Sequence, residues 1–158
     1  MKTKYIFLLL LVPLLVQCTA RKAQVQSTEE VVSFDKDQVW QLVAIQGKMV
    51  ARSSTEIILM FHPESGTLRG RVACNRYFAD YTLGGRYSDA EKGSHHSPST
   101  FHLSVSNISG GDVQCPEGGM AEQERYLALL GRVDACQVDA TSLTLYRNGK
   151  ETLKFELQ

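Results

Sequence analysis

Short stretches of alternating apolar and polar residues, separated by turn residues, run through most of the 158-residue chain. The clearest case closes the sequence, where "SLTLYR" and "ETLKFEL" flank "NGK". Asn148-Gly149 is a strong hairpin signal, because both residue types tolerate the positive φ angles of a two-residue turn. The second segment alternates leucine and phenylalanine with lysine and glutamate, as a half-buried strand does. This pattern restricts the chain to folds that are built mainly from antiparallel strands.

Further strands are predicted along the chain from composition and the same period of two. They cover residues 37–45, 56–61, 67–73, 77–83 and 101–108. Between the second and third of these, "HPESG" contains Pro63 and Gly66, which predicts a tight turn and therefore a second hairpin. The polar stretch 86–99 predicts a loop, and "ACQVDA" around Cys136 is strand-like.

The period changes to that of a helix between residues 116 and 133. The apolar side chains that share one face of this helix are Met120, Tyr126, Leu127, Leu130 and Val133. We expect its firm part at 121–133, because Gly118-Gly119 delays the start. Many strands and one helix predict an α+β fold, mainly an antiparallel curved sheet or incomplete β-barrel with one packed helix. The helix would cover an open mouth or face of the sheet.

The N-terminus has the features of an export signal. Two lysines precede an apolar run of about a dozen residues, which is too short to span a bilayer as a folded anchor. This arrangement predicts a secretory signal peptide over residues 1–17. Its removal would leave 15 basic and 17 acidic residues, a formal charge of −2 with no basic run. Nucleic acid is therefore not an expected partner.

Cys18 ends the apolar run where bacterial lipoprotein signals place their acylated cysteine. Gln17 departs from the usual small residue before that cysteine, so cleavage after Ala20 is the alternative. We expect a lipid on Cys18, a lipid-linked tether over 18–36 and a folded domain over 37–158. The lipid would make the membrane a partner of the chain.

Three cysteines remain for the domain, and an exported chain meets an oxidising compartment. A disulfide between Cys74 and Cys115 is favoured, because the first ends a strand and the second precedes the helix. Two alternatives stay open: all three thiols are reduced and buried, or Cys115 is a reactive thiol near a helix N-terminus. Cys136 has the character of a small buried residue.

Motifs for catalysis or metal binding are not found in the sequence. The four histidines (His62, His95, His96 and His102) lack the ligand spacings of a zinc site, and no nucleophile or phosphate-loop motif occurs. No catalytic residue, metal or cofactor is therefore predicted. Arg69, Arg71 and Arg76 form a small basic stripe that could bind carboxylate or phosphate, although an ordinary solvated strand face is the favoured interpretation.

Four stretches in combination resemble the META domain family, including its HslJ-like envelope lipoproteins. They are "VWQLVAIQGK", "LRGRVACNRYFADYTL", "VQCPEGGMAEQERYLALLGRV" and "DATSLTLYRNGKETLKF", and together they cover roughly residues 37–157. The positions that fall on the family's motif are Trp40, Gly70, Cys74, Asn75, Tyr77, Tyr81, Cys115 and Leu145. The resemblance implies a small mixed domain with a barrel-like antiparallel sheet in the bacterial envelope. It also implies links to heat response and novobiocin tolerance, with no established enzymatic activity.

These observations predict a non-enzymatic lipoprotein domain of the outer membrane that faces the periplasm, and the resemblance implies that it is stress-related. It would bind an envelope protein or an apolar ligand. The alternative is a thiol or redox protein that uses Cys74 or Cys115. In the favoured interpretation "CNRYF" is a fold signature, in which Asn75 bonds its local backbone or caps a turn.

Lipidation of Cys18 is directly testable. Cells that express the chain and are fed a clickable fatty acid should yield labelled protein, because acylation adds the fatty chain to this thiol. Replacement of Cys18 by Ser should abolish the label, while Cys136→Ser should keep it. A labelled Cys18→Ser variant, or an unlabelled wild-type chain that begins after Ala20, would contradict the prediction.

Overall fold

The computed structural model describes residue 34 and residues 38–50, 56–86, 100–116 and 118–158 of the chain. Within these residues it contains nine strands and one helix. The strands are β1 Trp40–Ile45, β2 Lys48–Met49, β3 Ile58–His62, β4 Thr67–Val72, β5 Asn75–Arg86, β6 Thr100–Gly110, β7 Ala135–Val138, β8 Ser142–Arg147 and β9 Lys150–Leu157. The helix α1, Gly119–Leu130, lies between β6 and β7 in the chain.

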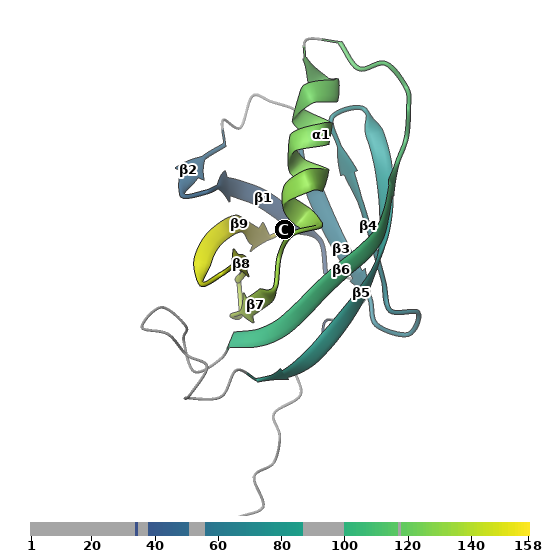
Figure 1. The fold of residues 1–158 in the computed structure, drawn as a ribbon. Coiled ribbons are helices and arrows are strands. Elements are labelled where there is room, and N and C mark those ends of the chain that lie inside the picture. The colour runs from purple at the N-terminus through teal and green to yellow at the C-terminus, as the bar shows by residue number, and fades with distance from the viewer. Residues whose placement is uncertain (1–33, 35–37, 51–55, 87–99, 117) are drawn as a thin grey trace, which may run out of the picture.

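All strands belong to one antiparallel sheet, which closes on itself (Figure 1). Neighbouring strands follow the chain order from β3 to β9, and β1 pairs with both β3 and β9. The closing register runs from Trp40 opposite Leu157 to Ile45 opposite Leu153. The prediction of a mainly antiparallel sheet with one packed helix is confirmed. The prediction of an incomplete barrel is wrong, because the β1–β9 hydrogen bonds close a barrel of eight strands and leave β2 outside it.

The interior of the barrel is filled by side chains that alternate inward along the strands. An eight-stranded barrel is just wide enough for side chains to fill. The large side chains that are almost fully buried are Trp40, Leu59, Phe61, Leu68, Tyr77, Leu143, Leu145, Leu153 and Phe155 from the strands, with Tyr126 and Leu130 from α1. Burial of each such side chain stabilises the fold by about 1.5–3 kcal/mol. The barrel is therefore a packed core over these positions.

Phe34 lies in this core although the sequence places it in the tether. Its side chain is only 2% exposed, and its ring stacks on that of Phe61 with the centroids 3.6 Å apart. Tyr81 contacts both rings edge-on. The packed part of the chain thus includes a residue upstream of residue 37, and an aromatic cluster fills this end of the barrel.

The turn residues explain why the last hairpin was predicted from the sequence and why β2 was not. Asn148 and Gly149 have φ angles of 49° and 72°, as the Asn-Gly signal predicts. Gln46 and Gly47 repeat that geometry with φ angles of 50° and 74° and connect β1 to β2. The sequence analysis missed β2 because glutamine seldom adopts a positive φ.

The helix differs from its predicted bounds at both ends. It begins at Gly119 and ends at Leu130, with Gly131 as its C-terminal cap. Val133 is buried in the core but lies beyond the helix. Only the first residues of β6 pair with β7, and α1 packs near the last residues of β6, Ile108 and Gly110. In Figure 1, α1 lies across one mouth of the barrel, as expected for the single helix.

Candidate functional site

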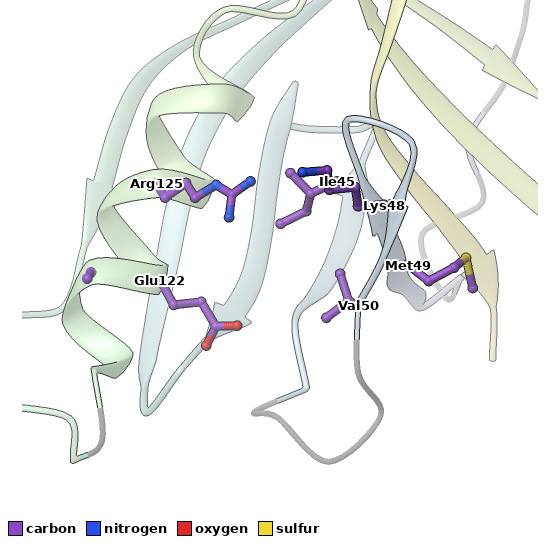
Figure 2. Close-up of a pocket in the computed structure, with 7 residues that line it drawn as sticks. Ile45, Lys48, Met49, Val50, Glu122 and Arg125 are labelled. Atoms are coloured by element: carbon purple, nitrogen blue, oxygen red, sulfur yellow. The ribbon is translucent and has the colours of Figure 1, made fainter.

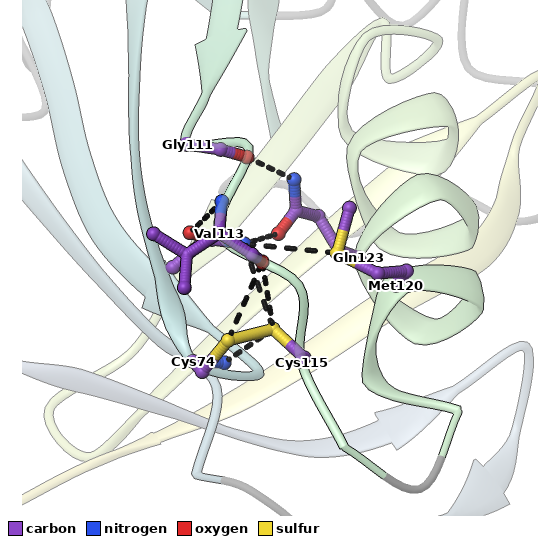
Figure 3. The surroundings of a disulfide bond; sticks show 7 residues. Cys74, Gly111, Val113, Cys115, Met120 and Gln123 are labelled. Atoms are coloured by element: carbon purple, nitrogen blue, oxygen red, sulfur yellow. Dashed lines mark hydrogen bonds between the residues drawn. A yellow bond between two sulfur atoms is a disulfide. The ribbon is translucent and has the colours of Figure 1, made fainter.

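A disulfide joins the β4–β5 turn to the segment that leads into α1 (Figure 3). Cys74 and Cys115 are 41 residues apart in sequence, and their Cα atoms are 5.5 Å apart. This is the pair that the element boundaries favour. The turn itself contains Ala73 at a φ of 50°, a left-handed conformation that is unfavourable for a residue with a Cβ atom. The disulfide holds this turn against the start of the helix.

Asn75 forms a second cross-link beside the disulfide, also through long-range contacts. Its side chain is 3% exposed, and its amide donates to the carbonyl of Val113 and to Oε1 of Gln123, both at 2.8 Å. Its carbonyl oxygen accepts from the N–H of Val113 at 3.2 Å. The expectation that Asn75 bonds its local backbone or caps a turn is wrong, because these partners lie 38 and 48 residues away.

Gln123 extends this network from the helix back to the chain after β6. Its side-chain amide donates to the carbonyl of Gly111 at 2.8 Å, and it is buried on the inner face of α1. Sequence analysis missed this residue. The available signal was a glutamine within the apolar face of the helix, three residues after Met120 and three before Tyr126. A polar side chain in such a position needs a buried partner.

Gly119 lets the helix approach the disulfide turn. A Cβ atom at this position would lie 2.7 Å from Cβ of Cys115 and 3.1 Å from Cβ of Ala73, which is closer than normal contact. The first residue of α1 therefore packs directly on the cross-linked turn. Together with Asn75 and Gln123, this contact fixes where the helix starts.

Tyr77 and Gly70 form the next inward layer of the barrel. The hydroxyl of Tyr77 donates to the carbonyl of Ile58 at 3.0 Å and lies 2.7 Å from the hydroxyl of Tyr126. Burial raises the pKa of both tyrosines above the usual range, so both rings stay neutral. A Cβ atom on Gly70 would collide with the carbonyl of Ile58 and the Tyr77 hydroxyl. Only glycine leaves room for this hydrogen-bonded pair.

The other motif residues also lie at core positions. Trp40 and Leu145 are almost fully buried on β1 and β8, and Tyr81 packs against the Phe34–Phe61 stack. The sequence-predicted residues of the domain therefore fall into two groups. Cys74, Asn75 and Cys115 cross-link the turn to the helix, and the others fill the barrel.

Cys136 is the third cysteine of the domain and is free. It is fully buried on β7, and burial raises the pKa of its thiol to about 12. At neutral pH this thiol is protonated and enclosed, so it is a poor nucleophile. The interpretation of three reduced cysteines is wrong, since Cys74 and Cys115 are bonded to each other.

A groove lies between α1 and the β1–β2 hairpin (Figure 2). Its volume is about 420 Å³, and its lining residues are Ile45, Lys48, Met49, Val50, Ala121, Glu122 and Arg125. Ile45 and Val50 supply an apolar floor, while Arg125 reaches from the helix toward the hairpin that carries Lys48. Neither cation has an acidic partner among the described residues. The groove is thus suited to a ligand that is apolar and carries a negative charge.

In the described part of the chain, no group of three or more histidine, cysteine, aspartate or glutamate side chains is arranged to hold a metal ion. His95 and His96 lie outside the described residues, as do Cys18 and the predicted signal peptide. Among the residues that the structure covers, no helix is both long and apolar enough to cross a membrane.

A closed antiparallel barrel with one helix across its mouth defines the structural class of this chain. A family model described as META domain matches residues 32–158. The chain therefore belongs to the META domain family. The match begins before Phe34, in agreement with the packing of that residue in the core.

One solved structure shows the same fold at low sequence identity. The chain is similar to an NMR structure of a protein from Burkholderia xenovorans, with a TM-score of 0.54 and 22% sequence identity over 82% of this chain and 94% of that one. A second NMR structure matches with a TM-score of 0.49 and 21% identity, covering 77% of this chain and 90% of that one. A search of the curated proteins finds no match.

Reduction of the disulfide should destabilise the domain. A cross-link that closes a loop of this length is expected to contribute about 4 kcal/mol by restricting the unfolded chain. Urea unfolding of the wild-type protein with and without a phosphine reductant measures the effect, with mass spectrometry to verify reduction. The Cys74→Ser/Cys115→Ser variant should be equally destabilised and should not respond to reductant. Equal unfolding midpoints for oxidised and reduced wild type would contradict this role.

Replacement of Asn75 by Ala should lower the free energy of unfolding by about 2 to 3 kcal/mol, because buried polar partners lose their hydrogen bonds. Gln123→Ala should cost less, and the double variant should cost less than the sum of the two. Urea unfolding of all three variants gives this coupling. The matched control is Thr82→Ala, an exposed position on the same strand. An Asn75→Ala variant as stable as that control would overturn the assignment.

Proposed function

We propose that this chain is a non-enzymatic lipoprotein domain of the bacterial envelope, anchored by Cys18 and facing the periplasm, that binds a segment of a partner protein. The observation that carries the proposal is the groove between α1 and the β1–β2 hairpin, with its apolar floor and two cations. A role in heat response or novobiocin tolerance, as in HslJ-like members, rests on family resemblance alone.

The packed interior favours a surface site over a ligand inside the barrel. Aromatic and leucine side chains fill the positions where an acyl chain would have to lie. Accommodating such a chain would require displacement of several of them, each of which stabilises the fold by a few kcal/mol. The groove needs no such rearrangement.

An extended peptide segment suits the groove because β2 is an edge strand. Among the described strands it pairs with β1 alone. Lys48 is opposite Ile45 across a two-residue turn, so these two residues form a hydrogen-bonded pair. The next pair of the ladder, Met49 and Ala44, is therefore a non-hydrogen-bonded pair. The backbone N–H and C=O of Met49 therefore point away from β1, and its side chain is 77% exposed. An added peptide strand uses such backbone groups for affinity and adjacent pockets for specificity.

The charges of the groove indicate the chemistry of that segment. Lys48 and Arg125 both line it, and Glu122 supplies one carboxylate that has a partner of its own. We expect a segment with apolar side chains and an acidic residue or a free C-terminal carboxylate, because a guanidinium binds carboxylates through paired hydrogen bonds.

The thiol alternative has no accessible thiol in the described residues. Cys74 and Cys115 are oxidised to a disulfide, and Cys136 is enclosed in the core. These facts favour a binding role over a thiol enzyme.

Site-specific photocrosslinking in the native envelope tests the groove. A benzoylphenylalanine at position 49 should form one discrete protein adduct, and the same probe at position 78, on the far side of β3 and β4, should not form it. Arg125→Glu should reduce the adduct at least fivefold by reversing one of the two cations. Arg147→Glu, which makes the same charge change at an exposed position on β8 outside the groove, should leave it intact. The absence of an adduct at position 49, or an adduct insensitive to Arg125→Glu, would refute the groove as a partner site.

A further inference from the structure

The outer face of β3, β4 and β5 brings three arginines and an exposed phenylalanine together. The register places Arg71 between Ile58 and Arg76 in one row across the strands. It places Arg69 between Met60 and Phe78 in the next row. Because the alternate residues Leu59, Leu68 and Tyr77 point into the barrel, all six of these side chains point outward. We call this set of six residues the arginine face.

Positive charge on the arginine face is only partly compensated. Arg71 and Arg76 are directly opposite each other, and like charges in such a pair repel. Glu56 pairs with Arg71 at 3.0 Å at one side of the face. Arg76 has no acidic partner among the described residues, and Asp80, further along β5, is held by Asn107 at 2.6 Å. An anion that bridges Arg71 and Arg76 would relieve their repulsion.

The same face has an exposed aromatic side chain and a shallow hollow. Phe78 is 51% exposed, and the guanidinium of Arg69 lies over its ring at 5.7 Å from the centroid. The hollow has a volume of about 330 Å³, and the six residues of the arginine face are among those that line it. Arginines beside an accessible aromatic ring suit the boundary between phosphate groups and acyl chains, because the ring can enter the apolar layer while the guanidinium groups stay with the phosphates.

We propose that the arginine face docks on a bilayer surface rich in anionic phospholipid. Arg71 and Arg76 bind lipid phosphates through their guanidinium forks, and the ring of Phe78 enters the upper part of the acyl-chain layer beside Arg69. An acidic protein surface would complement the charges of the three arginines, but it would not explain the accessible ring of Phe78 or the apolar side chains beside it. This face shares no lining residue with the groove, so the inference stands whether or not the groove binds a protein.

Tryptophan fluorescence with brominated lipids tests the docking. Full-length protein that carries Phe78→Trp is bound to vesicles of phosphatidylcholine or of a phosphatidylcholine–phosphatidylglycerol mixture, both brominated on the upper acyl chain. We expect strong quenching on the anionic vesicles, weak quenching on the neutral ones, and loss of the difference at high salt. Trp40 is buried, so the wild-type protein supplies the background signal. All variants share one N-terminus, so differences between them report on the arginine face.

Neutral variants separate docking from folding. Each arginine lost from a membrane-bound face weakens association about fivefold, so Arg69→Gln/Arg76→Gln should lower the docked-to-undocked ratio about 25-fold. The single Arg76→Gln variant covers the case in which the double variant is unstable, as judged by its melting temperature. Arg147→Gln, at an exposed position on β8 across the barrel, should leave the ratio unchanged. Equal quenching on neutral and anionic vesicles, or an equal effect of Arg147→Gln and Arg76→Gln, would overturn the proposal.

Discussion

The position of α1 depends on the cross-link between the β4–β5 turn and the segment that precedes the helix. The Cys74–Cys115 disulfide makes this connection covalently, and Asn75 makes it again through hydrogen bonds to Val113 and Gln123. α1 has no side-chain cap at its N-terminus, so its start is fixed by these contacts instead. One wall of the groove belongs to the helix, so the shape of the groove depends on the same cross-link.

Local sequence patterns were sufficient to predict most strands, but they did not predict that the sheet closes into a barrel. The period of two and the Asn-Gly turn each depend on residues within a few positions, and the predicted strands agree with the observed ones to within a few residues. Closure depends on Trp40 pairing with Leu157, a contact between the two ends of the domain. No local pattern encodes such a contact, because any amphipathic strand can pair with any other of similar pattern. Phe34 was assigned to the tether for the same reason, since its partner Phe61 is distant in sequence.

The sequence predicted some features of the candidate site fully, some in part and some not at all. Element boundaries were enough to favour the cysteine pair, because a cross-link between a turn and a helix start is visible in the order of elements. The type of Asn75 indicated a hydrogen-bonding role but not its partners, which are Val113 in the segment between β6 and α1 and Gln123 in the helix. The groove was not predicted at all. It depends on β2, whose turn uses a glutamine at positive φ, and on the angle at which α1 meets the hairpin.

Because side chains fill the interior of the barrel, a binding site is expected on its outer surface. In a closed barrel of eight strands with aromatic side chains at its centre, the remaining recognition elements are edges and faces. Here these are an edge strand beside a helix and an arginine-rich face on the other flank of β3. The sequence favoured an ordinary solvated strand for the arginines, since a stripe of charge is common on exposed strands. The register changes that judgement, because it sets Arg71 against Arg76 and puts the accessible ring of Phe78 beside Arg69. An unfavourable charge pair next to an exposed aromatic ring is better explained by an anionic, partly apolar surface than by water.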